Sequence, residues 1–289
     1  FHMHGGAAVV AALQRELIGL GARVAEAGEF TRRAFAHGRM DLTQAEALSD
    51  LLLAETELQR EQAMANAGGR LRARAEQWRA DLLALMAEVE ADLDFSDEDD
   101  VATREVAPRV AILADEIEAA LRSAPIAERV RQGLTIAVVG APNSGKSSLV
   151  NRLAGREVAI VTPHAGTTRD VIEVHLDLGG RAAILLDTAG LRETSDPVEA
   201  EGIARARARA AAADLVLDLG PSPNQNVVNR VDETGELPGY RDGRLYISAR
   251  TGDGLDALEA WLTNWAAEQI PAHEPPLVSS ARQADLLVY

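Results

Sequence analysis

A glycine-rich segment that ends in lysine and serine offers the clearest chemistry in this sequence: Gly140-Ala-Pro-Asn-Ser-Gly-Lys-Ser147. It follows an apolar run, Leu134 to Val139, and precedes a segment with helical spacing, Ser148 to Ala154. A strand, a glycine turn and a helix in this order gather backbone N–H groups around an anion. Lys146 can then reach the β- and γ-phosphates of a nucleotide, and the Ser147 hydroxyl can ligate Mg²⁺.

The intact spacing of this segment favours phosphate binding over a plain glycine turn between a strand and a helix. Lys146 is also predicted to act in catalysis, because it neutralises charge on the transferring phosphate. The sequence therefore predicts a P-loop whose nucleotide-binding residues are Asn143, Ser144, Gly145, Lys146, Ser147 and Ser148.

A second phosphate-side segment, Asp187-Thr-Ala-Gly190, ends another apolar run that begins at Ala182. An aspartate in this place can hold Mg²⁺ through water, and the Gly190 N–H can sense a γ-phosphate. The tetrapeptide alone would be weak evidence, but its position directly after a strand strengthens it.

The base is indicated by two further segments, Asn229-Arg-Val-Asp232 and Ser248-Ala-Arg250. The Asp232 carboxylate can accept hydrogen bonds from N1–H and from the exocyclic amine of guanine. Adenine has neither donor in that place, so the carboxylate would be left unpaired. Ala249 can offer its N–H to guanine O6, and the predicted ligands are therefore GTP and GDP.

In order and spacing these segments resemble the G boxes of translation-factor-like GTPases. The remaining box is Gly166-Thr-Thr-Arg-Asp170, in which Thr168 is the predicted second Mg²⁺ ligand and a catalytic residue. The lysines usual in the last two boxes are replaced by Arg230 and Arg250. Arginine can also pack flat over a base but differs from lysine in shape and hydration, so guanine affinity can differ.

Segments outside the G boxes narrow the family: His2–Gly6, Gly28–Phe35, Gly38–Glu46, Leu93–Asp99, Leu191–Arg192 and Asp196–Ile203. With these segments, the chain resembles the MnmE family (also called TrmE), the bacterial GTPases of tRNA wobble-uridine modification, over almost its whole length. A ribosome-assembly GTPase would share the P-loop with Asn143 but would lack residues 28–46 and carry an RNA-binding tail. A nucleotide-binding scaffold or folate module with little turnover is the other alternative.

The resemblance implies hydrolysis assisted by K⁺, since Leu191 rather than a glutamine follows the Asp187–Gly190 segment. Asn143 would help to hold K⁺, together with carbonyls of residues 162–165, once two G domains meet. Glu199 would orient the attacking water through a second water, and Arg192 would stabilise a switch segment. On the residues alone, Asn143 is equally a turn former, and Glu199 a favourable charge at a helix N-terminus.

The resemblance also implies partners. It predicts a homodimer, an FAD-dependent MnmG-type enzyme, and tRNA bound through that complex. The implied product carries a carboxymethylaminomethyl-type group at C5 of the wobble uridine. A tetrahydrofolate derivative would bind the amino-terminal domain, of which this sequence holds only the end.

Composition sets limits on the class of protein. Of 289 residues, 47% are hydrophobic and 26% charged, which suits a folded protein with a sizeable core. The net charge of −16 argues against nucleic-acid binding by bulk charge, so tRNA contact requires a local patch or a partner. The sequence holds no cysteine, which excludes disulfides. No apolar run approaches a membrane span and no signal peptide is visible, so the cytoplasm is expected.

The expected fold is an α/β P-loop GTPase domain, with a doubly wound and mostly parallel sheet, inserted into an all-α helical domain. The end of an α/β folate-binding domain would precede both. The predicted divisions are residues 1–40 for this remnant, 41–131 for the first part of the helical domain, 132–271 for the G domain, and 272–289 for a truncated return to the helical domain.

Within residues 41–131 the pattern predicts three helices. The first begins with a capping box, Thr43 and Glu46, and runs to Gly68 with an apolar face at Leu48, Leu51, Leu52 and Leu58. The second spans about 70–93 with Trp78, Leu82, Leu85, Met86 and Val89 on one face, and the third spans about 106–123 with Pro108 near its start. The acidic residues between them read as a solvated turn, because their spacing does not fit an EF-hand.

The connection between two predicted strands of the G domain is too short. Nine residues separate Leu217 from Val227, whereas a parallel crossover with its helix needs at least about 10–12. Either a helix is absent, or a stretch of the natural chain is missing from this sequence, and the intact flanking motifs favour the second reading.

Overall fold

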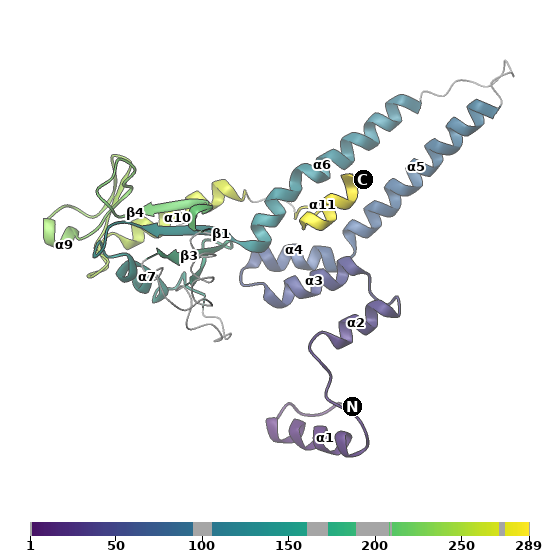
Figure 1. Ribbon diagram of the computed structural model, residues 1–289, viewed down its shortest axis with the longest axis horizontal. Coiled ribbons are helices and arrows are strands. Elements are labelled where there is room, and N and C mark those ends of the chain that lie inside the picture. Colours follow the sequence, from purple (N-terminus) through teal and green to yellow (C-terminus); the bar gives the residue numbers. More distant parts are fainter. Residues whose placement is uncertain are drawn as a thin grey trace.

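The computed structural model describes residues 2–94, 106–160, 173–188, 208, 210–271 and 275–288. In Figure 1 a G domain with its sheets lies on one side, a long pair of helices projects from it, and the amino-terminal helices lie below. Within these described ranges, no helix combines the length and the apolar character needed to cross a membrane.

The amino-terminal region consists of two helices, α1 (Ala7–Gly19) and α2 (Glu29–Ala36). No residue of α1 is buried, and Figure 1 shows this helix standing apart from the rest of the chain. The described part of residues 2–40 holds no strand. This region therefore contributes little to the core that positions the candidate site.

The first helix of the helical region, α3 (Leu42–Leu53), begins at a different cap from the predicted one. Asp41 Oδ1 accepts from the Gln44 N–H at 2.8 Å, and Gln44 Oε1 accepts from the Asp41 N–H at 3.1 Å. This reciprocal pair is a capping box, so the prediction of Thr43 and Glu46 was wrong. Asp41 offers the same bonds two residues earlier, which leaves the Glu46 side chain free for a distant partner.

The predicted single helix up to Gly68 is in fact two helices, because the chain turns at Ala54 and restarts at Thr56 as α4 (Glu57–Ala67). Thr56 donates its N–H to Gln59 Oε1 at 3.2 Å, which satisfies a free donor at the new helix start. The predicted apolar face is therefore interrupted, and the Leu52 side chain is 78% exposed.

Two long helices, α5 (Arg70–Asp94) and α6 (Val106–Gln132), form the projecting pair in Figure 1. The helix α11 (Ala281–Val288) lies beside them near their base. The shared core includes Trp78 and Leu85 from the predicted face. The other predicted core residues of this helix lie outside that core and are about half exposed: Leu82, Met86 and Val89.

The helix α6 starts at Val106 as predicted but continues through Pro125 to Gln132, beyond the predicted end at Ser123. Proline inside a helix normally breaks it. Here the last turns are fixed by burial of Ala127 and Val130 and by Gln62 Nε2, which donates to the Ala127 carbonyl at 3.1 Å. Tertiary packing outweighs the local cost, and α6 leads directly into the G domain.

The G domain is built on four strands in the order β2-β3-β1-β4. These are β1 (Leu134–Val139), β2 (Glu173–Asp177), β3 (Ala182–Asp187) and β4 (Leu215–Asp218). The strands β3, β1 and β4 are parallel, whereas β2 is antiparallel to β3. Fully buried leucines from α7 (Lys146–Ala154) and α10 (Leu255–Gln269) join the strands in one core. The predicted fold class is confirmed, with a mixed sheet.

A second, smaller sheet has the order β5-β7-β6 and comprises β5 (Val227–Val228), β6 (Gly239–Arg241) and β7 (Arg244–Tyr246). The short connection from β4 to β5 holds no helix. The Asn226 side chain joins the two sheets instead: Nδ2 donates to the Val216 carbonyl at 2.7 Å, and Oδ1 accepts from the Asp218 N–H at 2.8 Å. One amide thus makes two bonds that a neighbouring backbone would make in a continuous sheet.

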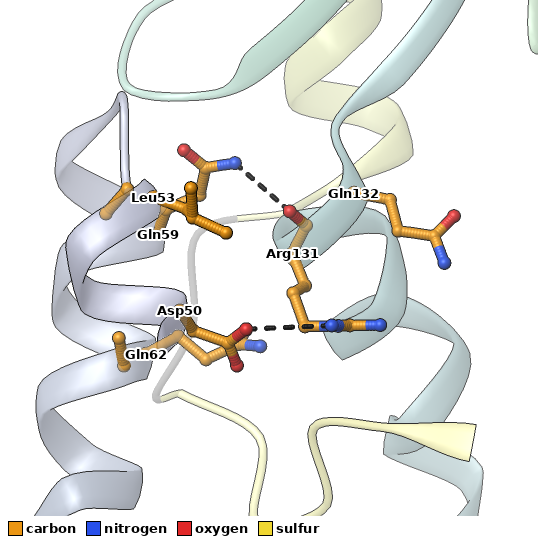
Figure 2. Close-up of a pocket in the computed structure, with 8 residues that line it drawn as sticks. Asp50, Leu53, Gln59, Gln62, Arg131 and Gln132 are labelled. Carbon is orange, nitrogen blue, oxygen red and sulfur yellow. Dashed lines mark hydrogen bonds and ion pairs between the residues drawn. The ribbon is translucent and has the colours of Figure 1, made fainter. Parts of the chain in front are cut away.

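The helical region and the G domain meet at the α3–α4 corner and the end of α6. A cavity of about 130 Å³ lies there. Figure 2 shows residues that line it, among them Asp50, Gln59, Gln62 and Arg131. Arg131 lies 3.6 Å from the Asp50 carboxylate, and Gln59 Nε2 donates to the Arg131 carbonyl at 3.2 Å. Burial nevertheless raises the pKa of Asp50. On the G-domain side, His175 Nδ1 lies 2.7 Å from Glu55.

Glu46 joins the first and last parts of the helical region. Its carboxylate accepts from Arg282 Nε at 2.6 Å, from Arg282 Nη2 at 2.7 Å, and from Gln283 Nε2 at 3.2 Å. These hydrogen bonds, with that of Arg282 the largest cause, hold the pKa of Glu46 below its ordinary value. A two-point Arg–carboxylate contact is among the stronger ion pairs.

We expect Glu46→Gln to lower the free energy of unfolding by about 1 kcal/mol at pH 7, as for a well-formed but partly exposed pair. Because the folded-state pKa is depressed, this contribution is present above the unfolded value and is lost as the pH falls through the folded one. In urea unfolding, the difference in free energy of unfolding between the parent and Glu46→Gln should become smaller below about pH 4.3. Glu57→Gln, which breaks an exposed pair within α4, is the control; an equal loss in both variants would contradict the assignment.

Candidate nucleotide-binding site

The loop between β1 and α7 is shaped by residues with positive φ: Gly140 at 145°, Asn143 at 63° and Gly145 at 97°. A Cβ at Gly145 would collide with Asn229 Nδ2, and a Cβ at Gly140 would lie 2.9 Å from Ser144 Oγ. Both backbone strain and lack of space therefore require glycine at these two positions. The predicted P-loop spacing has a steric cause in this structure.

Lys146 is the first residue of α7 and is buried, with 8% of its surface exposed. Its Nζ donates to the carbonyls of Gly140 and Ala141, both at 2.9 Å. The ammonium group is thus held across the loop that would enclose the phosphates. A cleft of about 640 Å³, within the range of ligand pockets, opens beside it. Its lining comprises Gly140, Pro142, Asn143, Gly145, Lys146, Ser147, Ser148, Thr188 and Arg230.

Asp187 comes to the same edge of the sheet as the P-loop, because β3 is paired in register with β1 and Val138 is opposite Asp187. Only 1% of Asp187 is exposed. The Ser147 hydroxyl and the Asp187 carboxylate are hard oxygen donors, the kind that Mg²⁺ takes beside phosphate oxygens. Among the described residues there is no group of three or more acidic or histidine side chains that could hold a metal ion.

Thr188 is a lining residue that the sequence reasoning did not assign. Its hydroxyl donates to the Val138 carbonyl at 2.7 Å, which fixes the backbone just after β3 against β1. The sequence did indicate this residue, because Thr188 belongs to the Asp187–Gly190 segment, of which only Asp187 and Gly190 have predicted functions.

Several predicted residues lie outside the described part of the chain. These are the K⁺-binding carbonyls of residues 162–165 together with Thr168, Gly190, Arg192 and Glu199. Of the predicted K⁺ ligands only Asn143 is described. Its left-handed backbone suits a turn former, and its side chain is exposed at the rim of the cleft, so both readings of this residue remain predictions.

Asn229 connects the P-loop to the base-side segments. Its Nδ2 donates to the Ser144 carbonyl at 3.0 Å, and its Oδ1 accepts from the Ala249 N–H at 2.9 Å. The Ala249 N–H, expected to face guanine O6, is therefore directed to Asn229 here. Arg230, with φ at 72°, donates its guanidinium to the Asn143 carbonyl, which ties the two segments a second time.

Asp232 is held in α9 (Val231–Thr234) with 9% of its side chain exposed. Its Oδ2 pairs with Arg250, whereas Oδ1 is buried and accepts no hydrogen bond from the described residues. The pKa of Asp232 lies below its ordinary value, first because of the Ser248 hydroxyl and then because of Arg250. Arg250 was expected to pack over a base; in this structure it contacts the carboxylate, the strongest acceptor within its reach.

The two halves of the site are thus adjacent and complementary to one kind of ligand. The P-loop half offers curled backbone and a buried ammonium group, which suit phosphates. The other half offers a charged acceptor, Asp232, with one unsatisfied oxygen. This combination can bind a guanine nucleotide, because guanine presents two adjacent donors to a carboxylate.

Comparison with known proteins covers nearly the whole chain. A family model described as the MnmE helical domain matches residues 42–289. A second, described as the GTP-binding protein TrmE N-terminus, matches residues 1–39.

Three curated relatives, each named tRNA modification GTPase MnmE, are also similar to this chain over nearly its whole length. The one from Rhodopseudomonas palustris (strain BisB5) is 47% identical over 324 residues, covering 99% of this chain and 70% of the relative. The one from Azorhizobium caulinodans is 50% identical over 299 residues, covering 99% and 68%. The one from Brucella anthropi is 48% identical over 307 residues, covering 99% and 68%.

Proposed function

The chain belongs to the MnmE (TrmE) family of tRNA modification GTPases, and we propose that it hydrolyses GTP with the help of K⁺. The proposal extends to a conformational cycle that serves C5 modification of the tRNA wobble uridine. The observation that carries it is the link made by Asn229, whose side chain bonds both the Ser144 carbonyl of the P-loop and the Ala249 N–H of the base-side segment.

In this proposal each half of the site has a separate task. Lys146 neutralises the β- and γ-phosphates, and Asp232 selects guanine over adenine. Ser147 and Thr168 would hold Mg²⁺ directly, and Asp187 through water. When bound, Mg²⁺ neutralises the charge that develops on the phosphates. Gly190 would sense the γ-phosphate with its N–H, and Ser248 and Ala249 would complete the base pocket.

We propose that a cation assists hydrolysis because the usual glutamine is absent from this sequence and Asn143 is present at the cleft. Leu191 stands where many GTPases have a glutamine, so another group must place the water, and Glu199 is our candidate. Asn143 at the rim of the cleft would contribute to a K⁺ site, completed by residues 162–165 when two G domains meet. The dimer would thus supply the positive charge that an arginine finger supplies elsewhere.

The partners follow from the family and from charge. With a net charge of −16, the chain is poorly suited to hold tRNA by bulk attraction. We propose that tRNA is bound through a complex with an FAD-dependent MnmG-type enzyme, in the cytoplasm, and that a carboxymethylaminomethyl-type group is added there. A tetrahydrofolate derivative would serve the carbon chemistry at the amino-terminal domain.

GTP hydrolysis is expected to run faster in KCl than in NaCl at equal ionic strength, by about tenfold or more. A positive charge preorganised at the transferring phosphates contributes about 10²–10³-fold when fully engaged, and Na⁺ has a different size and coordination. Steady-state phosphate release at matched ionic strength measures this, since screening alone alters dimerisation.

The matched variants are Asn143→Gly and Asn151→Ala. Glycine keeps the backbone angle at position 143 while removing the side-chain ligand, and Asn151 is exposed on α7 outside the cleft. Only the first should lose the difference between KCl and NaCl. Equal rates of the parent protein in the two salts, with dimerisation verified, would disprove the cation mechanism.

A further inference from the structure

The contact between Arg250 and Asp232 places a charged donor on the carboxylate that would read the base. Arg250 Nη2 donates to Asp232 Oδ2; Asp232 lies in α9, and Arg250 lies 18 positions later, between β7 and α10. The exposures differ sharply: 72% of the Arg250 side chain is exposed, against 9% for Asp232. The carboxylate is therefore fixed in the fold, while the guanidinium reaches it from solvent.

The chemistry of the two possible partners of Asp232 is similar. A guanidinium group is a planar carbon that carries several N–H donors. Guanine presents N1–H and its exocyclic amine from a comparable N–C–N edge. Both would direct N–H groups at the same carboxylate, so Arg250 and guanine cannot both bind Asp232 in the same way.

The remaining contacts of Asp232 indicate that Arg250 replaces guanine only in part as a hydrogen-bond donor to this carboxylate. Oδ1 is buried and accepts no well-formed hydrogen bond from the described residues, although the Ser248 hydroxyl lies close enough to lower the pKa of Asp232, whereas Oδ2 is paired with Arg250. An unsatisfied buried acceptor is costly, and a ligand with two adjacent donors would satisfy both oxygens. Arg250 is thus a weaker partner of the Asp232 carboxylate than a base with two adjacent donors.

We propose that Arg250 acts as a built-in competitor of guanine, which occupies Asp232 in the nucleotide-free protein and must leave before the base can bind. The inference rests on the proposed function, since it concerns the same site. Its consequence is a lower apparent affinity, because only the fraction of molecules with Asp232 free is competent to bind. Arg250 would also return to Asp232 as the base leaves, which favours nucleotide release.

The size of the effect follows from the type of ion pair. One partner is mostly exposed, and such pairs shift an equilibrium by about two- to fivefold. Arg250→Ala should therefore bind GDP about two- to fivefold more tightly than the parent. Arg250→Lys should lie between them, because a single ammonium imitates the planar edge less well.

The test is calorimetric titration of GDP into the full chain, with Arg244→Ala as the matched control. Arg244 is exposed at the start of β7, six positions before Arg250, and carries the same charge. Loss of general attraction to phosphate would weaken both variants, whereas release of a competitor strengthens only Arg250→Ala. Unchanged or weaker GDP binding by Arg250→Ala overturns the inference, since an arginine that packs over the base predicts weakening.

A double-variant cycle provides a readout that a purely structural role would not give. In the Asp232→Asn background the carboxylate is gone, so Arg250→Ala should no longer tighten binding, measured there with XDP. Equal tightening in both backgrounds would overturn the inference. Failure of the parent to bind GDP at all would instead remove the proposed function, so the two failures are distinguishable.

Discussion

Asp232→Asn is expected to weaken GDP and GTP binding by about 10²-fold and to create binding of XDP and XTP. The amide presents a donor where guanine also presents donors, whereas xanthine has a carbonyl in place of the amine. Hydrogen bonds to a charged group contribute about 1.5–3 kcal/mol, and the unpaired donors left behind add to the loss. Titration with the four nucleotides measures the change of preference.

Because Asp232 is buried, we expect the loss of nucleotide affinity in Asp232→Asn to be large. Few alternative donors or acceptors are within reach of a side chain that is 9% exposed, so solvent cannot replace the lost bonds easily. Glu233→Gln is the matched control, since Glu233 is the next residue of α9 but is half exposed. If GTP affinity is the same in Asp232→Asn and the parent, Asp232 does not read the base.

Glu199→Ala is expected to slow GTP hydrolysis by about 10²–10⁴-fold while leaving GTP affinity and melting temperature nearly unchanged. This is the size of effect associated with a group that positions and activates a nucleophile. A charge that merely stabilises a helix N-terminus contributes about 0.3–1 kcal/mol to stability and little to rate. The two readings of Glu199 therefore predict losses in different observables.

Single-turnover hydrolysis, with GTP binding measured separately, distinguishes the two readings. Glu201→Ala removes a like charge two positions along the chain and serves as the control. Dimerisation in KCl should survive in Glu199→Ala, because Asn143 and residues 162–165 are unchanged. A variant that hydrolyses at the parent rate but melts earlier would return Glu199 to a structural role.

The features that sequence reasoning placed well are those set by local signals. The strand Leu134–Val139 and the helix after it were placed within two residues, because an apolar run, a glycine turn and a helical pattern follow one another without interruption. The family assignment was likewise confirmed by the comparisons. Each of these depends on residues close together in the chain, whose spacing is visible without a fold.

The misplaced features are those settled by competition between local signals of similar strength. Thr43 and Asp41 both satisfy a capping pattern, and only the chosen helix start decided between them. The third helix was expected to end near Ser123, but it continues through Pro125, and burial of Val130 outweighs the cost of that proline. The turn at Ala54 carries neither glycine nor proline, so the pattern alone predicted one helix instead of two.

The sequence by itself determined the P-loop, the residue types around it and the family, because glycine conformation and phosphate chemistry act over a few residues. Only the tertiary structure decided which partner each side chain meets: Arg282 the Glu46 carboxylate, Asn226 the Val216 carbonyl, and Arg250 the Asp232 carboxylate. Arginine and a carboxylate attract at any sequence separation. Which pair forms depends on where the folded backbone carries each one, and that position is the sum of packing contacts along the whole chain.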